Sequence, residues 1–396
     1  MSIRQAPEGS LPMYSAPSVP QTAPPAVGFA LPGSEGKPLT LRTQTRRVMV
    51  GDVPVGGGAP IPVQSMCTTN THDIDATVAQ INELKAAGCE IVRVAVPHEA
   101  DALALGEIKR QIDVPLVADI HFGYRYALLA AEQGVDKLRL NPGNIGGRTA
   151  VERVVKVCRE RRIPLRIGVN AGSLEKEFIE KYGYPTPAGM VESALRHVRI
   201  LEDHGFHDII VSLKASDVAM ALAAYVGFSR ERDYPLHVGI TEAGPVKQGT
   251  IKSSVGIGAI LALGIGDTIR VSLTGDPVKE VGVGFDILKT LGLRVKGPMM
   301  VSCPSCGRVE IELFKIADEV EKRLEGYPES FKVAVMGCVV NGPGESQEAD
   351  FGIAGGKGVG LVYRNGEVIR RVREEELVAV LFEEIEKARA DGSLSR

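Results

Sequence analysis

The stretch EIVRVAVPHEADALALGEIKRQIDVPLVADI, residues 90–120, places a helical segment between two short apolar runs. The runs, 90–96 and 115–120, have the length and composition of buried strands, and strand alternating with helix predicts a parallel βαβ unit. The same pattern extends over most of the chain. Eight such runs follow one another, at residues 61–66, 90–96, 115–120, 137–140, 164–170, 208–215, 236–243 and 268–273.

Eight strand–helix units fit a TIM-like (β/α)8 barrel, which is an α/β fold. A doubly wound open sheet is the competing architecture, and it would place a Gly-rich phosphate-binding turn after the first strand. The sequence has SMCTTNTHD, residues 65–73, at that place. The barrel is therefore favoured, and we predict it over residues 39–296.

The pattern changes after residue 296. Residues 297–396 are typical of a small α+β domain, with a strand at 299–303, a helix at 312–326 and a strand at 331–340. A Gly-rich connection, a hairpin with Asn365-Gly366 at its turn and a last helix follow. At the other end, residues 1–38 are rich in Pro, Ser, Gly and Ala and are predicted to form a disordered tail.

Composition narrows the possible classes of function. The 396 residues are 44% hydrophobic and 24% charged with a net charge of -3, so no global feature indicates nucleic acid or an acidic membrane surface as a partner. No apolar run of about 18 residues predicts a membrane span. Trp is absent, which argues against a base-stacking platform. Six cysteines without a secretion signal indicate reduced thiols or metal ligands in the cytoplasm.

Three cysteines fall in the C-terminal domain. Cys303 and Cys306 form a CxxC pair, and Cys338 ends a predicted strand in GCVVNGPGE. Three thiolates on strand-to-loop turns suit an iron–sulfur cluster. The domain contains no histidine, so a fourth ligand would be a carboxylate, and Glu345 lies just past the Gly-Pro-Gly bend. A structural zinc site and a dithiol redox pair remain alternatives.

Charged residues near the carboxyl ends of the predicted strands are a second signal, because barrel strands are normally almost uniformly apolar. Arginine suits bidentate contacts with phosphate, so five cations on one face indicate a small polyanion such as a diphosphate. Some of them could pair with Asp119 or Glu242, although the acids are too few for all five. The cations are Arg93, Arg139, Arg166, Lys214 and Arg270, and beside them lie Asp119, His121, Asn141, Asn170, Ser212, His237, Glu242 and Ser272.

The histidines are weaker evidence. His121 and His237 could be satisfied core residues as easily as site residues, and His197 is expected at a surface.

These residues lie within longer motifs, among them VQSM (63–66), PLVADIHF (115–122), LRLNPGNIG (138–146), HVGITEAG (237–244) and CPSCGR (303–308). The motifs resemble those of the bacterial 4-hydroxy-3-methylbut-2-enyl diphosphate synthase family, from about residue 40 to the C-terminus. The resemblance implies a TIM-like barrel followed by an iron–sulfur domain similar to those of sulfite and nitrite reductases. It also implies a cytoplasmic enzyme of the methylerythritol phosphate route to isoprenoids.

The implied reaction is the reductive ring opening and dehydroxylation of 2-C-methyl-D-erythritol 2,4-cyclodiphosphate. Two electrons arrive singly through a [4Fe–4S] cluster from flavodoxin or ferredoxin. By the same resemblance, Glu242 is a candidate proton donor, and the cluster is held by Cys303, Cys306, Cys338 and Glu345. The substrate is held by Arg93, Arg139, Arg166, Asn170, Lys214, Arg270 and Ser272, with Asp119, His121 and Asn141 beside them.

The resemblance further implies a homodimer in which the cluster domain of one subunit closes over the barrel of the other. A non-redox barrel that binds a phosphorylated metabolite, with zinc in the C-terminal domain, is the alternative function. An electron-transfer adaptor is a third, but a pure carrier has no use for a cationic pocket. Cys67 departs from the family, whose members usually carry a hydroxyl residue there.

Overall fold

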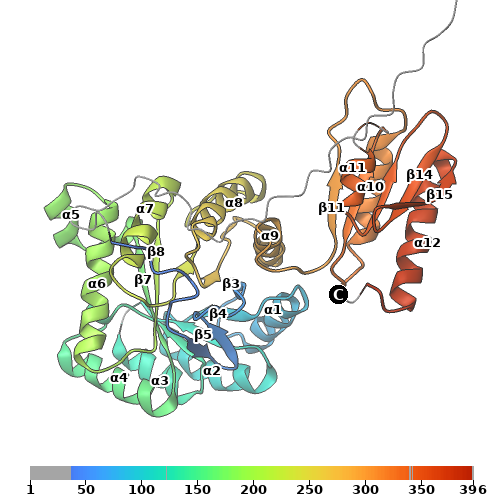
Figure 1. Ribbon diagram of the computed structural model, residues 1–396. Helices are drawn as coiled ribbons and strands as arrows, with labels where there is room; N and C mark the ends of the chain where they lie inside the picture. Colours follow the sequence, from blue (N-terminus) through green and yellow to red (C-terminus); the bar gives the residue numbers. More distant parts are fainter. Residues whose placement is uncertain (1–36, 122, 339, 341, 395–396) are drawn as a thin grey trace, which may run out of the picture.

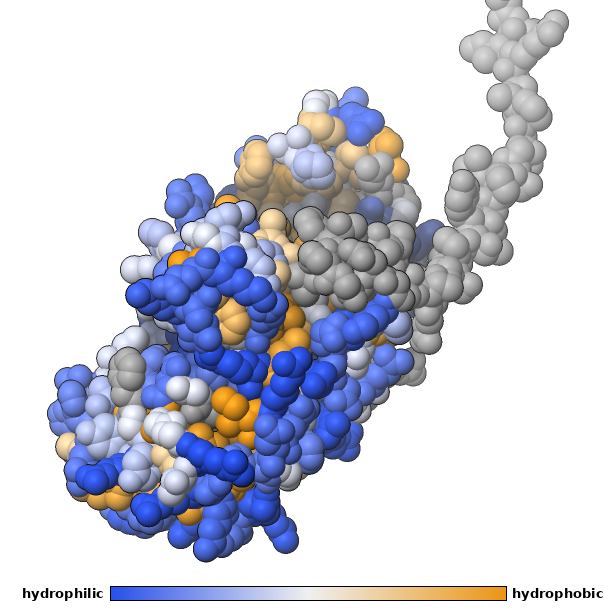
Figure 2. All heavy atoms as spheres, turned by 90° about the vertical axis from the view of Figure 1, so that its left-hand side faces the viewer, coloured by the Kyte–Doolittle hydropathy of each residue, from blue (hydrophilic) through white to orange (hydrophobic). Residues whose placement is uncertain are grey.

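The computed structural model describes residues 37–121, 123–338, 340 and 342–394. The predicted disordered tail, residues 1–38, lies almost entirely outside these residues. Within them the chain forms a barrel followed by a smaller mixed domain (Figure 1). Hydrophilic side chains cover most of the face shown in Figure 2. Among the described residues, no helix combines the length and the apolar character that crossing a membrane would require.

The eight predicted strands close into a ring. Six form one parallel sheet in the order β3-β4-β5-β6-β7-β8, and β9 pairs with β10. Bridges from Val211 to Leu236 and from Val63 to Ile269 join β8 to β9 and β10 to β3. Each strand lies within its predicted run: β3 Gln64–Met66, β4 Ile91–Ala95, β5 Leu116–Asp119, β6 Lys137–Arg139, β7 Leu165–Asn170, β8 Ile209–Lys214, β9 His237–Val238 and β10 Thr268–Ile269.

Helices connect the strands and surround the ring (Figure 1). Several begin at side-chain caps, as α7 does at Asp217 and α9 at Asp276, where the carboxylate accepts a backbone N–H of the first turn. The ring of helices comprises α1 Ile74–Ala86, α2 Glu99–Gln111, α3 Tyr124–Glu132, α4 Arg148–Arg161, α6 Pro187–Asp203, α7 Val218–Ser229, α8 Val246–Ala262 and α9 Pro277–Thr290. The loops after β6 and β7 carry the short elements η1 Pro142–Asn144, η2 Ala171–Ser173 and α5 Lys176–Tyr182.

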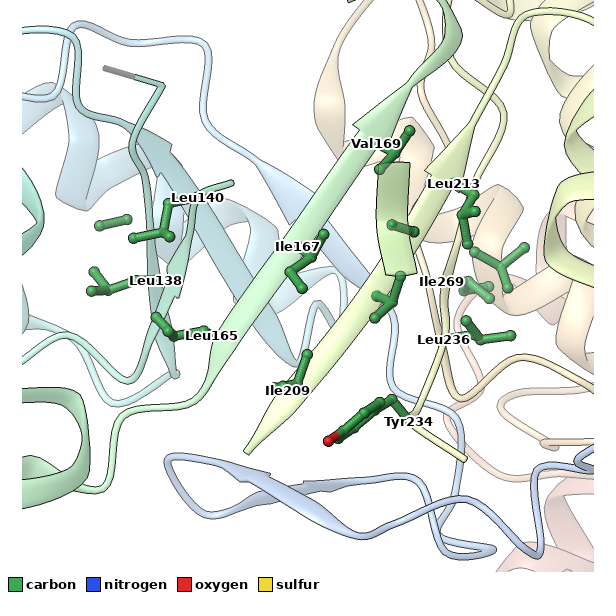
Figure 3. Packing of buried hydrophobic residues seen from close by; sticks show 14 of the residues in the cluster. Leu138, Leu140, Leu165, Ile167, Val169, Ile209, Leu213, Tyr234, Leu236 and Ile269 are labelled. Carbon is green, nitrogen blue, oxygen red and sulfur yellow. The ribbon is translucent and has the colours of Figure 1, made fainter. Parts of the chain in front are cut away.

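Strand periodicity explains how charged residues fit inside buried strands. In β7, Leu165 and Ile167 belong to the apolar core between sheet and helices (Figure 3). Their neighbours Arg166, Gly168 and Asn170 line a cavity at the centre of the barrel. Successive residues of a strand point to opposite faces, so the same strand supplies core packing outside and polar groups inside.

A hairpin that the sequence analysis did not predict closes the other end of the barrel. Strands β1 (Val48–Val50) and β2 (Val53–Val55) pair antiparallel and pack on Ile91, Val117 and Ile210 at the amino ends of β4, β5 and β8. Because apolar side chains fill this end, the cavity opens at the carboxyl ends of the strands.

The C-terminal domain has a five-stranded sheet in the order β11-β12-β13-β14-β15. Its first three strands are parallel, and β14 and β15 form the predicted hairpin, with positive φ at Asn365 and Gly366 as a tight two-residue turn requires. The Gly-rich connection contains β13 and α11, which the sequence analysis missed. The elements are β11 Met299–Ser302, α10 Leu313–Leu324, β12 Lys332–Met336, α11 Gly342–Gln347, β13 Phe351–Ala354, β14 Gly360–Arg364, β15 Glu367–Val372, η3 Glu374–Glu376 and α12 Leu377–Ala390.

The segment between the domains is attached to the barrel by its basic residues. Arg294 Nη1 donates to Glu90 Oε2 at 2.6 Å and to the carbonyl of Ile61 at 3.0 Å. Lys296 Nζ donates to the carbonyl of Ala87 at 3.0 Å. These contacts attach the chain to the barrel as far as Lys296, three residues before β11 begins.

Candidate functional site

A polar cavity of about 300 Å³ lies at the carboxyl ends of the barrel strands, a size that suits a small metabolite. Nearly all of the predicted substrate-binding residues line it, including the five cations. Asn141 and Glu242 do not. The lining residues are Met66, Arg93, Asp119, His121, Arg139, Arg166, Gly168, Val169, Asn170, Ser212, Lys214, Thr241, Arg270 and Ser272.

Asp119 pairs with two of the cations. Its carboxylate lies 3.1 Å from Arg139 Nη1 and 3.7 Å from Arg93 Nε. Burial by itself would raise the pKa of Asp119, but the positive charges of Arg93 and Arg139 outweigh burial and lower the pKa to about 2. The side chain is therefore a carboxylate at neutral pH and fixes the two guanidinium groups in place.

Two other cations lack such a partner. Arg166 is 2% exposed and donates from Nη1 to Ser212 Oγ at 2.9 Å, while its Nε and Nη2 have no hydrogen-bond partner among the described residues. Lys214 is buried and forms no ion pair with any residue that the structure describes. Burial, and then the neighbouring positive charges, lower the pKa of both groups well below their usual values. Burying a donor without an acceptor costs free energy, and the oxygen atoms of an anion would satisfy these donors.

Glycines make room for these side chains. A Cβ at Gly168 would lie 2.5 Å from Arg139 Nε, and one at Gly239 would lie 2.7 Å from Lys214 Nζ. Asn141, although it does not line the cavity, holds Gly168 through both backbone groups: it donates to the carbonyl at 3.1 Å and accepts the N–H at 2.9 Å. The interior of the barrel is therefore shaped around the cations.

Glu242 lies on the loop after β9 in a strained conformation. Its φ of 45° is in the left-handed region that non-glycine residues rarely adopt. Its Oε1 accepts a hydrogen bond from Thr241 Oγ1 at 2.9 Å, and Thr241 lines the cavity. Such strain is concentrated at functional sites, and it fits a role for this exposed carboxylate at the entrance of the cavity.

Two residues in and beneath the site, Met66 and Lys137, escaped the sequence analysis, whereas His237 was expected either in the core or in the site. Met66 lies at the end of β3, and its Sδ accepts contacts from Arg93 Nε at 3.0 Å and Nη2 at 2.8 Å. Deeper in the barrel, Lys137 is fully buried and reaches Gln64 Oε1 at 3.3 Å. His237 is buried as well, with neither ring nitrogen hydrogen-bonded within the described chain. A charged residue inside the apolar run 137–140 was the available signal for Lys137.

The expectation that His197 lies at a surface is wrong. The ring is fully buried on α6, with Nε2 2.7 Å from Glu175 Oε1, while Nδ1 accepts the N–H of Gly143 at 3.2 Å. Gly143 belongs to the loop after β6 and Glu175 to the loop after β7. His197 therefore joins the loop that carries Asn141 to the loop that follows Asn170.

Cys67 is buried beside this site rather than in it. Burial raises the pKa of its thiol to about 12, and the side chain is not among those that line the cavity.

A second cavity gathers the three cysteines of the C-terminal domain. It is lined by Cys303, Pro304, Cys306, Arg308, Met336, Gly337 and Cys338. The N–H of Gly337 donates to Cys303 Sγ at 3.3 Å. Hydrogen bonds from the backbone and the side chain of Arg308 lower the pKa of the exposed Cys306 thiol. The lowered pKa favours the thiolate of Cys306, which is the form that binds iron or zinc.

Glu345 does not join the cysteines in this structure. It lies in α11 with an exposed side chain, and it is not among the residues that line the cysteine cavity. In residues 37–121, 123–338, 340 and 342–394, no three His, Cys, Asp or Glu side chains are gathered closely enough to hold one metal ion.

Comparison with known proteins matches both parts of the chain to one family. Residues 45–285 match the family described as the GcpE TIM-barrel domain, and residues 299–387 match the GcpE protein C-terminal domain. The chain belongs to the GcpE family. The 4-hydroxy-3-methylbut-2-en-1-yl diphosphate synthase (flavodoxin) of Geobacter sulfurreducens is 62% identical over 351 residues, which are 89% of this chain and 99% of that protein. The enzyme of the same name from Geobacillus thermodenitrificans is 60% identical over 87% of this chain and 92% of its own.

Membership of the GcpE family confirms the predicted barrel followed by a C-terminal domain. It also confirms the predicted enzyme class, an iron–sulfur oxidoreductase that forms 4-hydroxy-3-methylbut-2-enyl diphosphate in isoprenoid precursor biosynthesis. Among solved structures, the dihydropteroate synthase of Yersinia pestis is similar with a TM-score of 0.46 and 14% identity, over 62% of this chain and 98% of that one. That similarity is too distant to bear on function.

Proposed function

We propose that the barrel domain, residues 39–296, binds 2-C-methyl-D-erythritol 2,4-cyclodiphosphate and that the C-terminal domain, residues 297–396, delivers electrons to it. The observation that carries this proposal is the charge of the barrel cavity. Among the described lining residues five are cations and one, Asp119, is an acid. A ligand with two phosphate groups neutralises this excess and gives acceptors to Arg166 and Lys214.

The cysteine cavity fits an iron–sulfur cluster better than a single zinc ion. One zinc ion holds all its ligands at about 2.0–2.3 Å, so its thiolates must lie close together. A [4Fe–4S] cube instead spreads its ligands over different iron atoms, and three thiolates around one cavity, none of them clustered for a single ion, support that arrangement. The proposed ligands are Cys303, Cys306, Cys338 and Glu345, the last of which would have to move toward the cavity.

The residues of the chain have separable parts in the proposed reaction. The bound cluster would supply electrons one at a time. Arg139, Arg166, Lys214 and Arg270 hold the phosphate groups and so fix the carbon framework between them. Loss of the hydroxyl as water requires a proton at the departing oxygen, and Glu242, whose hydrogen-bond partner Thr241 lines the cavity, is the proposed donor.

The two cavities belong to different domains and share no described lining residue. We therefore retain the homodimer, in which the C-terminal domain of one subunit covers the barrel of the other and excludes water from the reaction. Flavodoxin, named for the relatives, is the proposed electron donor, with ferredoxin as the alternative. The cytoplasmic location stays a prediction.

Anaerobic reconstitution tests the proposed chemistry. Protein loaded with iron and sulfide is given the cyclic diphosphate and a one-electron reductant, and the product is analysed. We expect 4-hydroxy-3-methylbut-2-enyl diphosphate from the wild type and from the control C67S. C306S should lose both the visible absorption of the cluster and the product. Colourless, zinc-loaded wild-type protein that binds the diphosphate without turning it over would support the non-redox alternative.

Mixed dimers test the arrangement of the subunits. K214A damages a barrel and C306S damages a cluster site, so each variant alone should be inactive. Coexpressed, they form mixed dimers in which one C-terminal domain and one barrel are intact, but on different subunits. Activity in the mixed dimer supports sharing between subunits, whereas an inactive mixed dimer contradicts it.

A further inference from the structure

Glu280 is a buried acid directly behind the barrel cavity. It lies in the first turns of α9, 3% exposed, and is not among the residues that line the cavity. Its Oε2 lies 3.4 Å from Nε of Arg270, and its Oε1 accepts the N–H of Leu273 at 3.0 Å. A third contact comes from β3, where Ser65 Oγ donates to Oε2 at 2.9 Å. The carboxylate is thus held from three sides.

These contacts fix one edge of Arg270. Glu280 occupies the Nε edge of the guanidinium group, and Nη1 lies 3.7 Å from Met66 Sδ. Arg270 itself lines the cavity with its side chain 15% exposed. Because the guanidinium group is planar and rigid, holding its Nε edge also determines where its terminal N–H groups point.

We propose that Glu280 is a positioning residue that orients Arg270 toward a phosphate group of the ligand; this rests on the proposed binding of a diphosphate in the barrel. The proposal makes a prediction opposite to that of charge alone. Glu280 carries a negative charge close to an anion site, so by Coulomb's law its removal should tighten anion binding. If Glu280 instead orients Arg270, its removal weakens binding, because the arginine loses its alignment.

The test compares pyrophosphate binding by calorimetry in wild-type protein, E280Q and the matched control S65A. S65A removes the hydrogen bond from β3 but leaves the pair between Arg270 and Glu280 intact. We expect E280Q to weaken binding about tenfold, the effect of losing one charge-assisted contact, and S65A to change it less than about twofold. Unchanged or tighter binding by E280Q overturns the proposal.

A double-mutant cycle separates positioning from general damage to the fold. In an R270A background, E280Q should have no further effect on binding, because its action passes through Arg270. A further loss of similar size in that background would indicate a purely structural role and overturn the proposal.

If E280Q does not fold, E280D replaces it. The aspartate keeps the charge but withdraws it by one methylene group. Positioning therefore predicts weaker binding than in the wild type, whereas charge alone predicts no change in binding. Wild-type binding is the separate readout for the proposed function. If wild-type protein bound neither pyrophosphate nor the cyclic diphosphate, both proposals would fail, whereas wild-type binding with unaltered E280Q and E280D would refute only the role of Glu280.

Discussion

Replacing Asp119 with asparagine should destabilise the barrel by an amount that can be worked out from its ion pairs. The carboxylate is 4% exposed, and in the folded protein its pKa is lowered from 3.8 to about 2. At about 1.4 kcal/mol for each pKa unit, the ion pairs with Arg93 and Arg139, after the opposing cost of burial, stabilise the ionised form by about 2–3 kcal/mol. The D119N side chain has nearly the same shape but no charge, so at pH 7 the free energy of unfolding should fall by about that amount.

The burial of Arg93 determines what the expected loss of unfolding free energy in D119N represents. Burial lowers the pKa of Arg93 to about 10 even though Asp119 acts to raise it. Arginine keeps its charge at neutral pH even when it is buried, so in D119N the charge of Arg93 remains while its partner is gone. The value of about 2–3 kcal/mol is thus the cost of breaking an existing pair, and replacing both partners with apolar groups would cost less.

The dependence on pH has a definite sign. A folded pKa below the unfolded one gives a stabilisation that is complete above about pH 4 and is lost as the pH falls through 2. Urea unfolding, with hydrogen exchange of β5 peptides to identify the barrel transition, should show a constant difference between wild type and D119N from pH 5 to pH 8. The difference should shrink below about pH 4. The surface control D113N, whose partner is Lys85, should leave the barrel transition unchanged. A difference in the free energy of unfolding between wild type and D119N that is near zero at pH 7, or that persists undiminished to pH 3, would refute this reasoning.

Three further predictions follow from the site. G168A places a Cβ against the guanidinium group of Arg139 and should weaken pyrophosphate binding about tenfold by calorimetry. G172A, whose Cβ would lie at an ordinary contact distance of 4.0 Å from its nearest neighbour, Asn170 Oδ1, should not. A bound anion should raise the lowered pKa of Lys214, so binding should be accompanied by proton uptake and should weaken as the pH rises. Calorimetry in buffers of different ionisation enthalpy measures the uptake, and K214M should abolish most of it. H197A removes the contacts with Glu175 and Gly143, and it should lower the free energy of unfolding, measured with urea, by about 2 kcal/mol. It should also raise KM several-fold in steady-state kinetics. An unchanged KM would show that the two loops hold their positions without His197.

The order of the elements and most of the site's composition could be predicted from the sequence. Strand runs and helices have local periodicities, and the carboxyl ends of parallel strands in a barrel meet at one face, so Arg93, Arg139 and Lys214 could be assigned to one site from their places in separate runs. The hairpin turn at Asn365-Gly366 was equally readable, since it depends on two adjacent residues.

Only the tertiary structure decided which of these groups face each other and what supports them. Ser65 and Glu280 meet although 215 positions separate them, and no local pattern distinguishes Glu280 from other helical acids. The short β1–β2 hairpin and β13 form through contacts with distant strands, because segments of three or four residues have too little periodicity to predict. Ion pairing and burial, which shift the pKa of Asp119 in opposite directions, depend on distances between separate strands. Those distances are determined by the closure of the ring, which no single stretch of the chain encodes.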